Sequence, residues 1–464
     1  MPDTFTLYAP FDRRPLGEFT LSDWAAADAA LTAAARLHAA GSPLPKYRRL
    51  EILENLAAAM LREREHLARI AAEEGGKPWN DTLVEIGRAI QGVKYAAAAL
   101  QTLAGEEIPM ELTPASAGKL ACTIREPAGV ILAISAFNHP VNLIIHQVIP
   151  AVAAGCPAIV KPALTTPRSC LRVVELLYEA GLPPEWCRVI LCDNDTVGRM
   201  AADGRIAFLN FIGSARVGWR LRSNLAPGVR CALEHGGAAP VIVDETADVR
   251  RIAPLLAKGG FYHAGQVCVS VQRVFAAGQN AAALAEEIAA VGRSYTVGNP
   301  LLPATDVGPL ITPAECSRVG EWVREAESGG GVIVGNYPEN RGKLSETCFA
   351  PTVLLDPPDD ARISREEVFG PVIAVYACAT ADEAVARANN MRYAFQAAVF
   401  TENLRAALDM AKRLNASAVM LNDHTAFRTD WMPFGGRGES GLGTGGIGRT
   451  LRDYTQEKLL VFAG

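Results

Sequence analysis

Four short apolar runs constrain the fold of this chain most strongly. They are Gly129–Ile134, Ala158–Lys161, Val189–Leu191 and Ala207–Phe211. Each is almost continuously apolar, as expected for a strand of a parallel sheet that helices cover on both faces. Helical segments are predicted between the runs. This alternation predicts a doubly wound α/β sheet with crossover helices.

The first third of the chain is predicted to be helical. Asp23 can cap a helix that continues to Ala40. Pro45 opens a long amphipathic helix that stops at Gly75. A third helix is expected over about residues 80–103.

The second half of the chain repeats the strand–helix alternation. Val241–Val243 is a predicted strand and Asp248–Phe261 a predicted helix, and further alternation runs from Val271 to Leu421. A glycine-rich loop, Pro433–Gly443, and a terminal strand, Lys458–Phe462, follow. Because no repeat or low-complexity linker separates the two halves, we expect domains with interdigitated boundaries.

Composition narrows the classes of protein to which this chain can belong. Its 464 residues are too many for one hydrophobic core, so two or three domains are expected. A net charge of −5 argues against a surface for nucleic acid or anionic membranes. The ten cysteines lack metal or disulfide spacing, no apolar run can span a bilayer, and Met1 to Thr4 do not begin a signal peptide. We therefore expect a reduced, cytoplasmic protein with no metal site and no nucleic-acid or membrane partner.

A cysteine in a glycine-rich loop is the strongest candidate for chemistry. Cys268 lies in the segment Gly259–Ser270, ahead of a β-branched run. A thiolate is the most nucleophilic side chain near neutral pH, and Gly265 lets backbone N–H groups converge beside it. The alternative is a small buried hydrophobic residue, which is what most unpaired cysteines are.

Two segments have the character of a cofactor site. Gly213 to Gly218 follows a predicted strand and opens a helix, so backbone N–H groups and the Ser214 hydroxyl face any phosphate placed there. The segment departs from the glycine fingerprint of dinucleotide-binding folds, and the alternative is an ordinary strand-to-helix turn. Lys161 ends a strand and suits a ribose or phosphate contact, with a solvated lysine as the alternative.

Polar residues near predicted strand ends complete the candidate set. Ser135 and Asn138 follow the first buried strand, at the carboxyl end where ligands bind in open α/β sheets. Asn138 can donate an amide N–H to a ligand, or can cap a helix. Glu234 precedes two glycines and Glu367 follows another glutamate, and a solvated turn residue is the alternative for each.

Together these motifs resemble the aldehyde dehydrogenase superfamily, from about residue 20 to the terminal strand. They stand in that family's order at roughly its separations. The motifs are Phe137–Pro140, Lys161–Pro162, Phe211–Ser214 with Val217–Gly218, Leu233–Gly237, Gly265–Cys268, Glu367–Pro371, and Pro433–Gly436 with Ser440–Gly441. Within the superfamily the chain looks most like the lactaldehyde, phosphonoacetaldehyde and semialdehyde dehydrogenase branches.

The resemblance implies an α/β fold with two Rossmann-like domains and a small β-hairpin oligomerisation element. We expect the cofactor-binding domain over residues 1–108 and 128–236, and the catalytic domain over 237–437. The oligomerisation element is expected over 109–127 and 438–464. The resemblance also implies NAD or NADP as the cofactor, a small aldehyde as the substrate, and a homodimer or homotetramer.

The resemblance also implies roles for single residues. Cys268 is expected to attack the aldehyde carbon, Asn138 to stabilise the oxyanion, and Glu234 to activate water for hydrolysis of the thioester. The residues expected to bind the cofactor are Ser135, Phe137, Lys161, Gly213, Ser214, Gly218, Glu367 and Phe369. Two other classes remain open: a CoA-acylating dehydrogenase, and a relative without activity that only binds or has a structural role.

Three positions depart from the family pattern. Phe137 replaces a tryptophan, and His263 replaces a frequent asparagine. Many NAD-preferring members carry a glutamate where this chain has Leu164. Without that carboxylate a 2′-phosphate is not repelled, so NADP becomes acceptable beside NAD.

The residues expected to line the substrate pocket are polar. They are Arg88, Asn142, His146, His424 and Arg428. Two guanidinium groups in one dry pocket need an anion, so we expect a short aldehyde with a carboxylate, phosphonate, sulfonate or hydroxyl group. In the alternative, protein carboxylates satisfy them: Arg88 pairs with Glu85 or another helix carboxylate, and Arg428 with Asp423 or Asp430.

Overall fold

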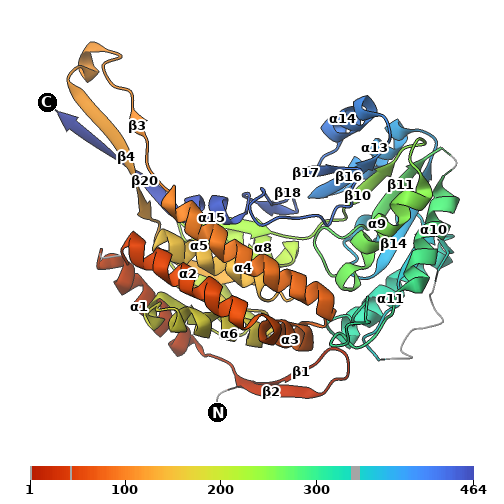
Figure 1. Cartoon of the computed structure of the whole chain (residues 1–464), viewed down its shortest axis with the longest axis horizontal. Helices are drawn as coiled ribbons and strands as arrows, with labels where there is room; N and C mark the ends of the chain where they lie inside the picture. Colours follow the sequence, from red (N-terminus) through yellow and green to blue (C-terminus); the bar gives the residue numbers. More distant parts are fainter. Residues whose placement is uncertain (1–2, 42–43, 279, 336–344, 464) are drawn as a thin grey trace.

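The computed structural model describes residues 3–41, 44–278, 280–335 and 345–463. Two large sheets, each covered by helices, lie side by side, and a narrow β-ribbon projects away from them (Figure 1). The expected two-part α/β architecture is therefore confirmed. The expectation that no signal peptide opens the chain rests on Met1 to Thr4. Residues 1–2 of this segment lie outside the described residues.

The first sheet has the strand order β19-β9-β8-β5-β6-β7 and is parallel except for β19. Its strands are β5 (Val130–Ile134), β6 (Ala158–Lys161), β7 (Cys187–Val189), β8 (Ile206–Ile212), β9 (Arg230–Glu234) and β19 (Gly441–Leu442). Three of the four predicted strands are confirmed. The strand predicted at Val189–Leu191 ends at Val189, two residues early, because the chain then turns into the N-cap of the next helix.

Alternate residues of the central strand β5 pack into two different cores. Ile131 and Ala133 lie with one set of helices, while Leu132 and Ile134 lie with another. One face carries α2 (Lys46–Arg62), α3 (Arg64–Gly75), α4 (Trp79–Gln101), α5 (Asn142–Ala154), α6 (Pro167–Glu179) and α15 (Ile447–Asp453). The other carries α1 (Trp24–Ala39), α7 (Asn194–Ala201) and α8 (Ala215–Ser223). The sheet is thus buried on both sides, as its uninterrupted apolar strands predict.

Two predictions for the first third are wrong. The single helix from Pro45 to Gly75 is two helices, because Glu63 leaves helical geometry at φ −99° and ψ 17°. An N-terminal hairpin of β1 (Thr4–Tyr8) and β2 (Pro15–Thr20) was not foreseen. β2 has no buried residue and β1 alternates over only five residues, and side-chain contacts such as Arg14 to Glu73 (3.1 Å) hold the hairpin to the body.

The second sheet has the order β12-β13-β14-β11-β10-β16-β17, parallel except for the edge strand β12. Its strands are β10 (Pro240–Val243), β11 (Arg273–Ala277), β12 (Val332–Ile333), β13 (Thr352–Leu355), β14 (Val372–Cys378), β16 (Gln396–Phe400) and β17 (Ala418–Leu421). Its helices are α9 (Val249–Phe261), α10 (Ala281–Ser294), α11 (Pro313–Ser328), α12 (Arg362–Arg365), α13 (Ala381–Asn389) and α14 (Leu404–Arg413). The strand predicted from Val241 and the helix that follows it are confirmed.

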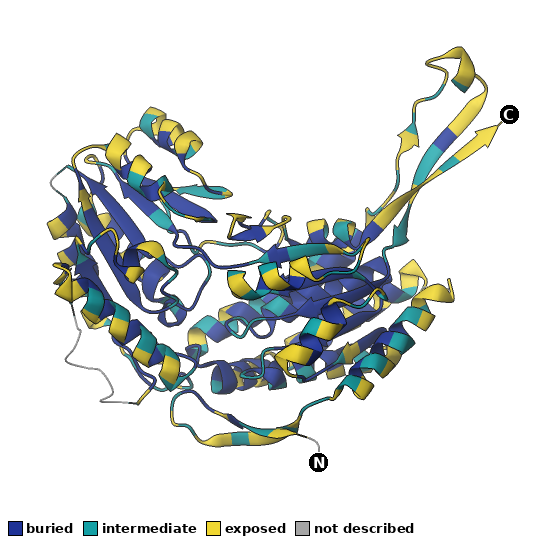
Figure 2. Cartoon of the chain, turned by 180° about the vertical axis from the view of Figure 1, so that it is seen from behind, coloured by how far each residue is buried: buried dark blue, intermediate teal, exposed yellow. Residues whose placement is uncertain are grey.

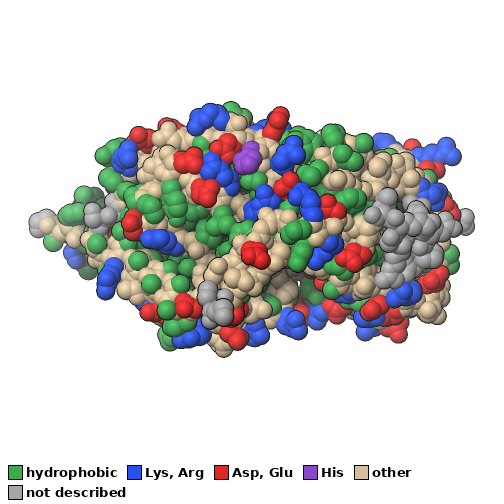
Figure 3. Space-filling view, turned by 90° about the horizontal axis from the view of Figure 1, so that it is seen from below, with side chains coloured by type: hydrophobic (Ala, Val, Ile, Leu, Met, Phe, Trp, Pro, Cys, Tyr) green, Lys and Arg blue, Asp and Glu red, His purple; other side chains and the backbone are tan. Residues whose placement is uncertain are grey.

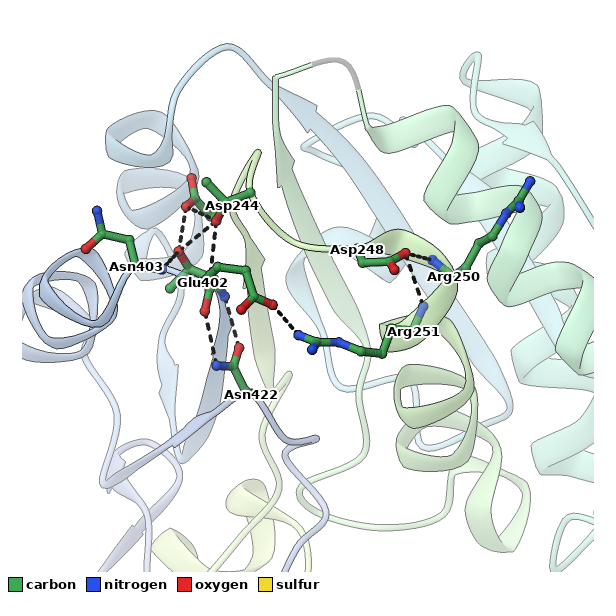
Figure 4. A network of polar contacts seen from close by, with 9 residues as sticks. Asp244, Asp248, Arg250, Arg251, Glu402, Asn403 and Asn422 are labelled. Atoms are coloured by element: carbon green, nitrogen blue, oxygen red, sulfur yellow. Dashed lines mark hydrogen bonds and ion pairs between the residues drawn. The ribbon is translucent and has the colours of Figure 1, made fainter.

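A polar network fixes the chain where it leaves β17 (Figure 4). The Asn422 side chain accepts from the N–H of Thr401 and donates to its carbonyl, both at 3.0 Å. The Thr401 hydroxyl donates to Asp244 at 2.6 Å, which ties β16 to β10. Asn422 also has a left-handed backbone (φ 58°), so the loop that begins at Asp423 leaves the sheet in a fixed direction.

The projecting ribbon consists of β3 (Glu107–Ile108), β4 (Lys119–Pro127) and β20 (Thr455–Ala463). β4 and β20 pair antiparallel along nine residues each, as the expected pairing of the hairpin with the terminal strand requires. Much of the ribbon is exposed in Figure 2, and its exposed side chains include Leu120, Leu459 and Phe462. A short antiparallel pair, β15 (Tyr393–Ala394) with β18 (Arg437–Gly438), belongs to the last quarter of the chain.

Charged side chains of both signs are interspersed over the face seen from below in Figure 3. No helix among the described residues combines the length and the apolar character that crossing a membrane requires. Among those same residues, no three His, Cys, Asp or Glu side chains are grouped so as to hold a metal ion.

Candidate active site

A cavity of about 910 Å³ lies between the carboxyl ends of strands of the first sheet and the loops that precede β11 and β14 of the second. Ser135, Lys161 and Glu234 reach it from the first sheet, and Cys268 and Glu367 reach it from loops of the second. The strand ends of an open α/β sheet are its usual ligand site. The structure therefore brings the sequence-predicted residues of both halves into one cleft.

The backbone just before Cys268 adopts an uncommon conformation. His263, Ala264 and Gly265 are consecutively left-handed, with φ values of 49°, 53° and 69°. A side chain on Gly265 would place its Cβ 2.0 Å from the carbonyl oxygen of Gly370. Left-handed non-glycine residues cost on the order of 1 kcal/mol each. The tight turn is held by packing and presents Cys268 at the cavity wall.

The thiol of Cys268 faces the carboxylate of Glu234, with Sγ to Oε1 at 4.0 Å. Burial raises the pKa of Cys268 well above its ordinary value, and the carboxylates of Glu234 and Glu367 add to this. Burial also raises the pKa of Glu234 to about 6, although the positive charge of Arg428 opposes the shift. A protonated thiol beside a carboxylate of near-neutral pKa is the arrangement that general-base activation requires.

The Asn138 side chain is held in place beside the cysteine loop. Its Nδ2 donates to the carbonyl of Gln266 at 2.9 Å, and Gln266 in turn accepts from the N–H of Ile311 at 2.9 Å. α5 begins only at Asn142, with Val141 as its N-cap, so Asn138 does not cap it. Because an amide nitrogen carries two hydrogens, a second N–H of Asn138 remains available at the cavity.

The residues at the other end of the cavity fit a nicotinamide dinucleotide. The amino group of Lys161 has no hydrogen-bond acceptor among the described residues, and burial lowers the pKa of this group. The buried Ser135 hydroxyl likewise has no partner in the described part of the chain. Gly213 and Ser214 precede the first turn of α8, whose N–H groups favour an anion. These unsatisfied donors suit ribose hydroxyls and phosphates.

Close packing and ring contacts complete this end of the cavity. A Cβ on Gly218 would lie 2.0 Å from the His235 ring, so only glycine lets α8 approach the sheet this closely. The Glu367 carboxylate accepts from the N–H of Gly237 at 3.3 Å, and burial raises its pKa to about 8. Phe369 meets Phe137 edge to face, with ring centres 5.9 Å apart.

Leu164 lines the cavity two residues from Pro162. Leu164→Glu is expected to raise the NAD/NADP ratio of kcat/KM, because the new carboxylate repels a 2′-phosphate by at most a few kcal/mol. Leu164→Gln is the matched control, since it offers similar hydrogen bonds without the charge. Steady-state kinetics with both cofactors measure the ratio, and a Glu variant that behaves like the Gln variant would place the ribose elsewhere.

Three of the predicted substrate residues contact the carboxylate of Asp430 at the inner wall of the cavity. This carboxylate accepts two hydrogen bonds from Arg88, at 2.8 and 3.2 Å. It also accepts from Asn142 at 3.1 Å and lies 2.8 Å from Nε2 of His146. Arg88 therefore already has its anion. The alternative that Arg88 pairs with Glu85 or another helix carboxylate is wrong, because its partner Asp430 lies in the loop after β17.

Glu85 forms a buried ion pair with Lys77, which the sequence did not predict. Lys77 and Glu85 are both at most 1% exposed and lie 2.5 Å apart. The other oxygen of Glu85 accepts the N–H groups of Val141 and Asn142, each at 3.0 Å, and so holds the start of α5. No local pattern in the sequence predicts that Glu85 of α4 bonds both to Lys77 and to the start of α5.

Arg428 is the guanidinium that lacks a carboxylate partner. No carboxylate of the described residues lies within 4.0 Å of its nitrogens, so the expected pairing with Asp423 or Asp430 is not formed. Its Nη2 lies 3.5 Å from Nδ1 of His146, and its plane stacks on Phe434 at 3.4 Å. His424 lies farther out, with its side chain packed over Gly259.

The fold and this cleft define a two-domain α/β enzyme. One end of its cavity suits a nucleotide cofactor, and the other end holds a thiol. The chain matches the aldehyde dehydrogenase family over residues 1–460 and belongs to it. It is an oxidoreductase that oxidises aldehydes with NAD or NADP.

Individual relatives agree with this assignment. The chain is 36% identical to a 3-sulfolactaldehyde dehydrogenase of Priestia aryabhattai over 417 residues, covering 89% of this chain and 86% of the relative. It is 30% identical to a sulfoacetaldehyde dehydrogenase of Neptuniibacter caesariensis, covering 99% and 100% of the two chains. Its fold matches a glyceraldehyde-3-phosphate dehydrogenase of Methanocaldococcus jannaschii complexed with NADP, with a TM-score of 0.93, 30% identity and full coverage of both chains.

Proposed function

We propose that this enzyme oxidises a short aldehyde bearing an anionic group to its carboxylic acid. The observation that carries the proposal is Arg428, a cation without a carboxylate partner in the described chain, in the same cavity as Cys268 and Glu234. A half-buried cation of this kind is costly unless a ligand supplies the counter-charge. Two relatives named for sulfonated aldehydes are consistent with such a ligand.

The proposed reaction uses the residues that meet at the inner end of the cleft. Glu234 takes the proton of the Cys268 thiol, and the sulfur bonds to the aldehyde carbon. The free N–H of Asn138 and the backbone N–H of Cys268 stabilise the oxyanion. Lys161, Gly213 and Ser214 would hold NAD(P)⁺, which would supply the acceptor for the hydride of that carbon. Once Glu234 has released the thiol proton to solvent, its carboxylate activates the water that hydrolyses the resulting thioester and frees Cys268.

The anionic end of the substrate is proposed to bind Arg428. Stacking on Phe434 and the contact with His146 hold the guanidinium plane, which leaves N–H groups for the ligand. Arginine suits a carboxylate or sulfonate because two parallel N–H groups match two oxygens. The aldehyde end then points toward Cys268.

Arg428→Ala is expected to lower kcat/KM for a short acidic semialdehyde by about 30- to 100-fold, the value of a hydrogen bond to a charged group. An uncharged aldehyde of equal length should lose far less. Arg405→Ala, at an exposed arginine of α14, is the control for loss of a positive charge. Preference of the wild-type enzyme for the uncharged aldehyde, or an equal loss for both substrates in the Ala variant, would overturn the proposal.

We further propose that the ribbon joins copies of this chain in a homodimer or homotetramer. Leu120, Leu459 and Phe462 are each more than 50% exposed, with Leu120 paired to Phe462 across the two strands, and apolar exposure of this kind suits a partner surface. The proposed domains remain those expected from the sequence. Residues 438–464 were expected to belong to the oligomerisation element. Their first part lies outside the projecting ribbon, because β19 pairs with β9 and α15 packs on α4 and α5. A cytoplasmic location remains a prediction from the cysteine spacing.

A further inference from the structure

The charges at the inner wall of the substrate pocket form a connected chain. Arg88 of α4 binds Asp430 through two hydrogen bonds, and the Asp430 side chain is only 3% exposed. His146 of α5 joins Asp430 to Arg428, with contacts of 2.8 and 3.5 Å from its two ring nitrogens. Two arginines and one aspartate therefore share this wall.

The imidazole of His146 carries no charge in this chain. Burial lowers its pKa to about 4, against the opposing effect of the hydrogen bond to Asp430. With a carboxylate at Nε2, that nitrogen holds the hydrogen, and Nδ1 is left as the acceptor for Arg428. The wall thus carries two positive charges and one negative charge.

We propose that Asp430 is a positioning residue that sets the charge specificity of the pocket, so that the enzyme prefers aldehydes bearing one negative charge over those bearing two. The proposal rests on the proposed function. Asp430 neutralises Arg88 and leaves Arg428 as the one unpaired cation of this wall, among the described residues. A singly charged sulfonate or carboxylate matches that surplus, whereas a doubly charged phosphonate exceeds it.

The other ionisable groups of the cleft do not change the expected preference for one negative charge over two. Glu234 lies beside Cys268 and also favours the charged form of Arg428, but its charge is the same for either substrate and in both variants. Asp81 and Lys258, of opposite sign, both line the cavity and attract each other. The surplus at the anionic end is therefore set by Arg88, Asp430 and Arg428.

The test compares sulfoacetaldehyde, phosphonoacetaldehyde and an uncharged aldehyde of similar length at about pH 8, where a phosphonate carries close to two charges. Asp430→Asn keeps an acceptor for Arg88 and His146 but removes the negative charge. It should raise the phosphonate/sulfonate ratio of kcat/KM about tenfold. Arg88→Met removes a positive charge and should lower the same ratio by a similar factor.

A purely structural role for Asp430 would reduce turnover of every substrate and leave the ratio unchanged in both variants. Opposite shifts in the two variants support the proposal, and unchanged or parallel shifts overturn it. If the Asn variant does not fold, as judged by circular dichroism, the Met variant decides: a lower ratio supports the proposal and a constant ratio overturns it. Wild-type preference for the uncharged aldehyde would instead contradict the proposed function itself.

Discussion

Replacing Cys268 by alanine is expected to abolish aldehyde oxidation, with a loss of at least about 10⁴-fold in kcat. The thiol is the group in the cleft that can bond to the aldehyde carbon, and it lies 4.0 Å from the carboxylate that can take its proton. Cofactor binding should stay near normal, because the thiol does not belong to the end of the cavity that holds Lys161 and Ser214. Reduced-cofactor absorbance measures turnover, and fluorescence titration measures cofactor binding.

The matched control is Cys231→Ala. Cys231 is a half-buried cysteine of β9 that does not line the cleft, so its loss should leave the rate nearly unchanged. More than a trace of activity in the Cys268 variant would show that the nucleophile is another residue.

Glu234→Gln is expected to slow the steady state by about 100- to 10,000-fold, the usual contribution of a general base. Hydrolysis of the thioester needs the carboxylate, whereas the first hydride transfer should still be visible as a burst, provided that the thiol can lose its proton by another route. A wild-type steady-state rate in this variant would assign the base to another group. Adding CoA also tests the acyl-transfer alternative, since a CoA-acylating enzyme would require CoA for turnover.

The same residue predicts a pH dependence. The ionised form of Glu234 acts as the base, and burial raises its pKa to about 6. Activity should therefore be full above about pH 7 and should fall as the pH drops through about 6. Because glutamine does not ionise, this acidic limb should be absent from the residual activity of the Gln variant. A limb that persists unchanged would belong to another group.

Much of the frame could be predicted from local patterns. The apolar runs of β5, β6 and β8 lie within one residue of their predicted places, because a strand buried on both faces needs continuous apolar sequence. The hairpin β1–β2 was missed, since its two strands are short and bury only Leu7, so they carry no continuous apolar run. The break at Glu63 was missed as well, because the apolar periodicity continues across it.

The candidate nucleophile, base and amide were also visible in the sequence, because each stands in a glycine-rich or strand-end motif that limits where its side chain can lie. The structure added how these residues meet. Cys268 and Glu234 come from different sheets, and only the packing of the two sheets fixes their 4.0 Å separation. Burial in this shared cleft also raises the pKa of the thiol and of the carboxylate.

The sequence by itself determined the alternation of buried strands and helices, the family and the chemical groups of the cleft, because these depend on neighbours along the chain. Only the tertiary structure decided which arginine is available to a substrate. Arg88 and Asp430 are 342 residues apart, yet they form a bidentate pair, and Arg428 is left with a histidine and an aromatic ring. A charge is satisfied by whatever lies within a few ångströms, and that distance is set by the packing of α4, α5 and the loop after β17.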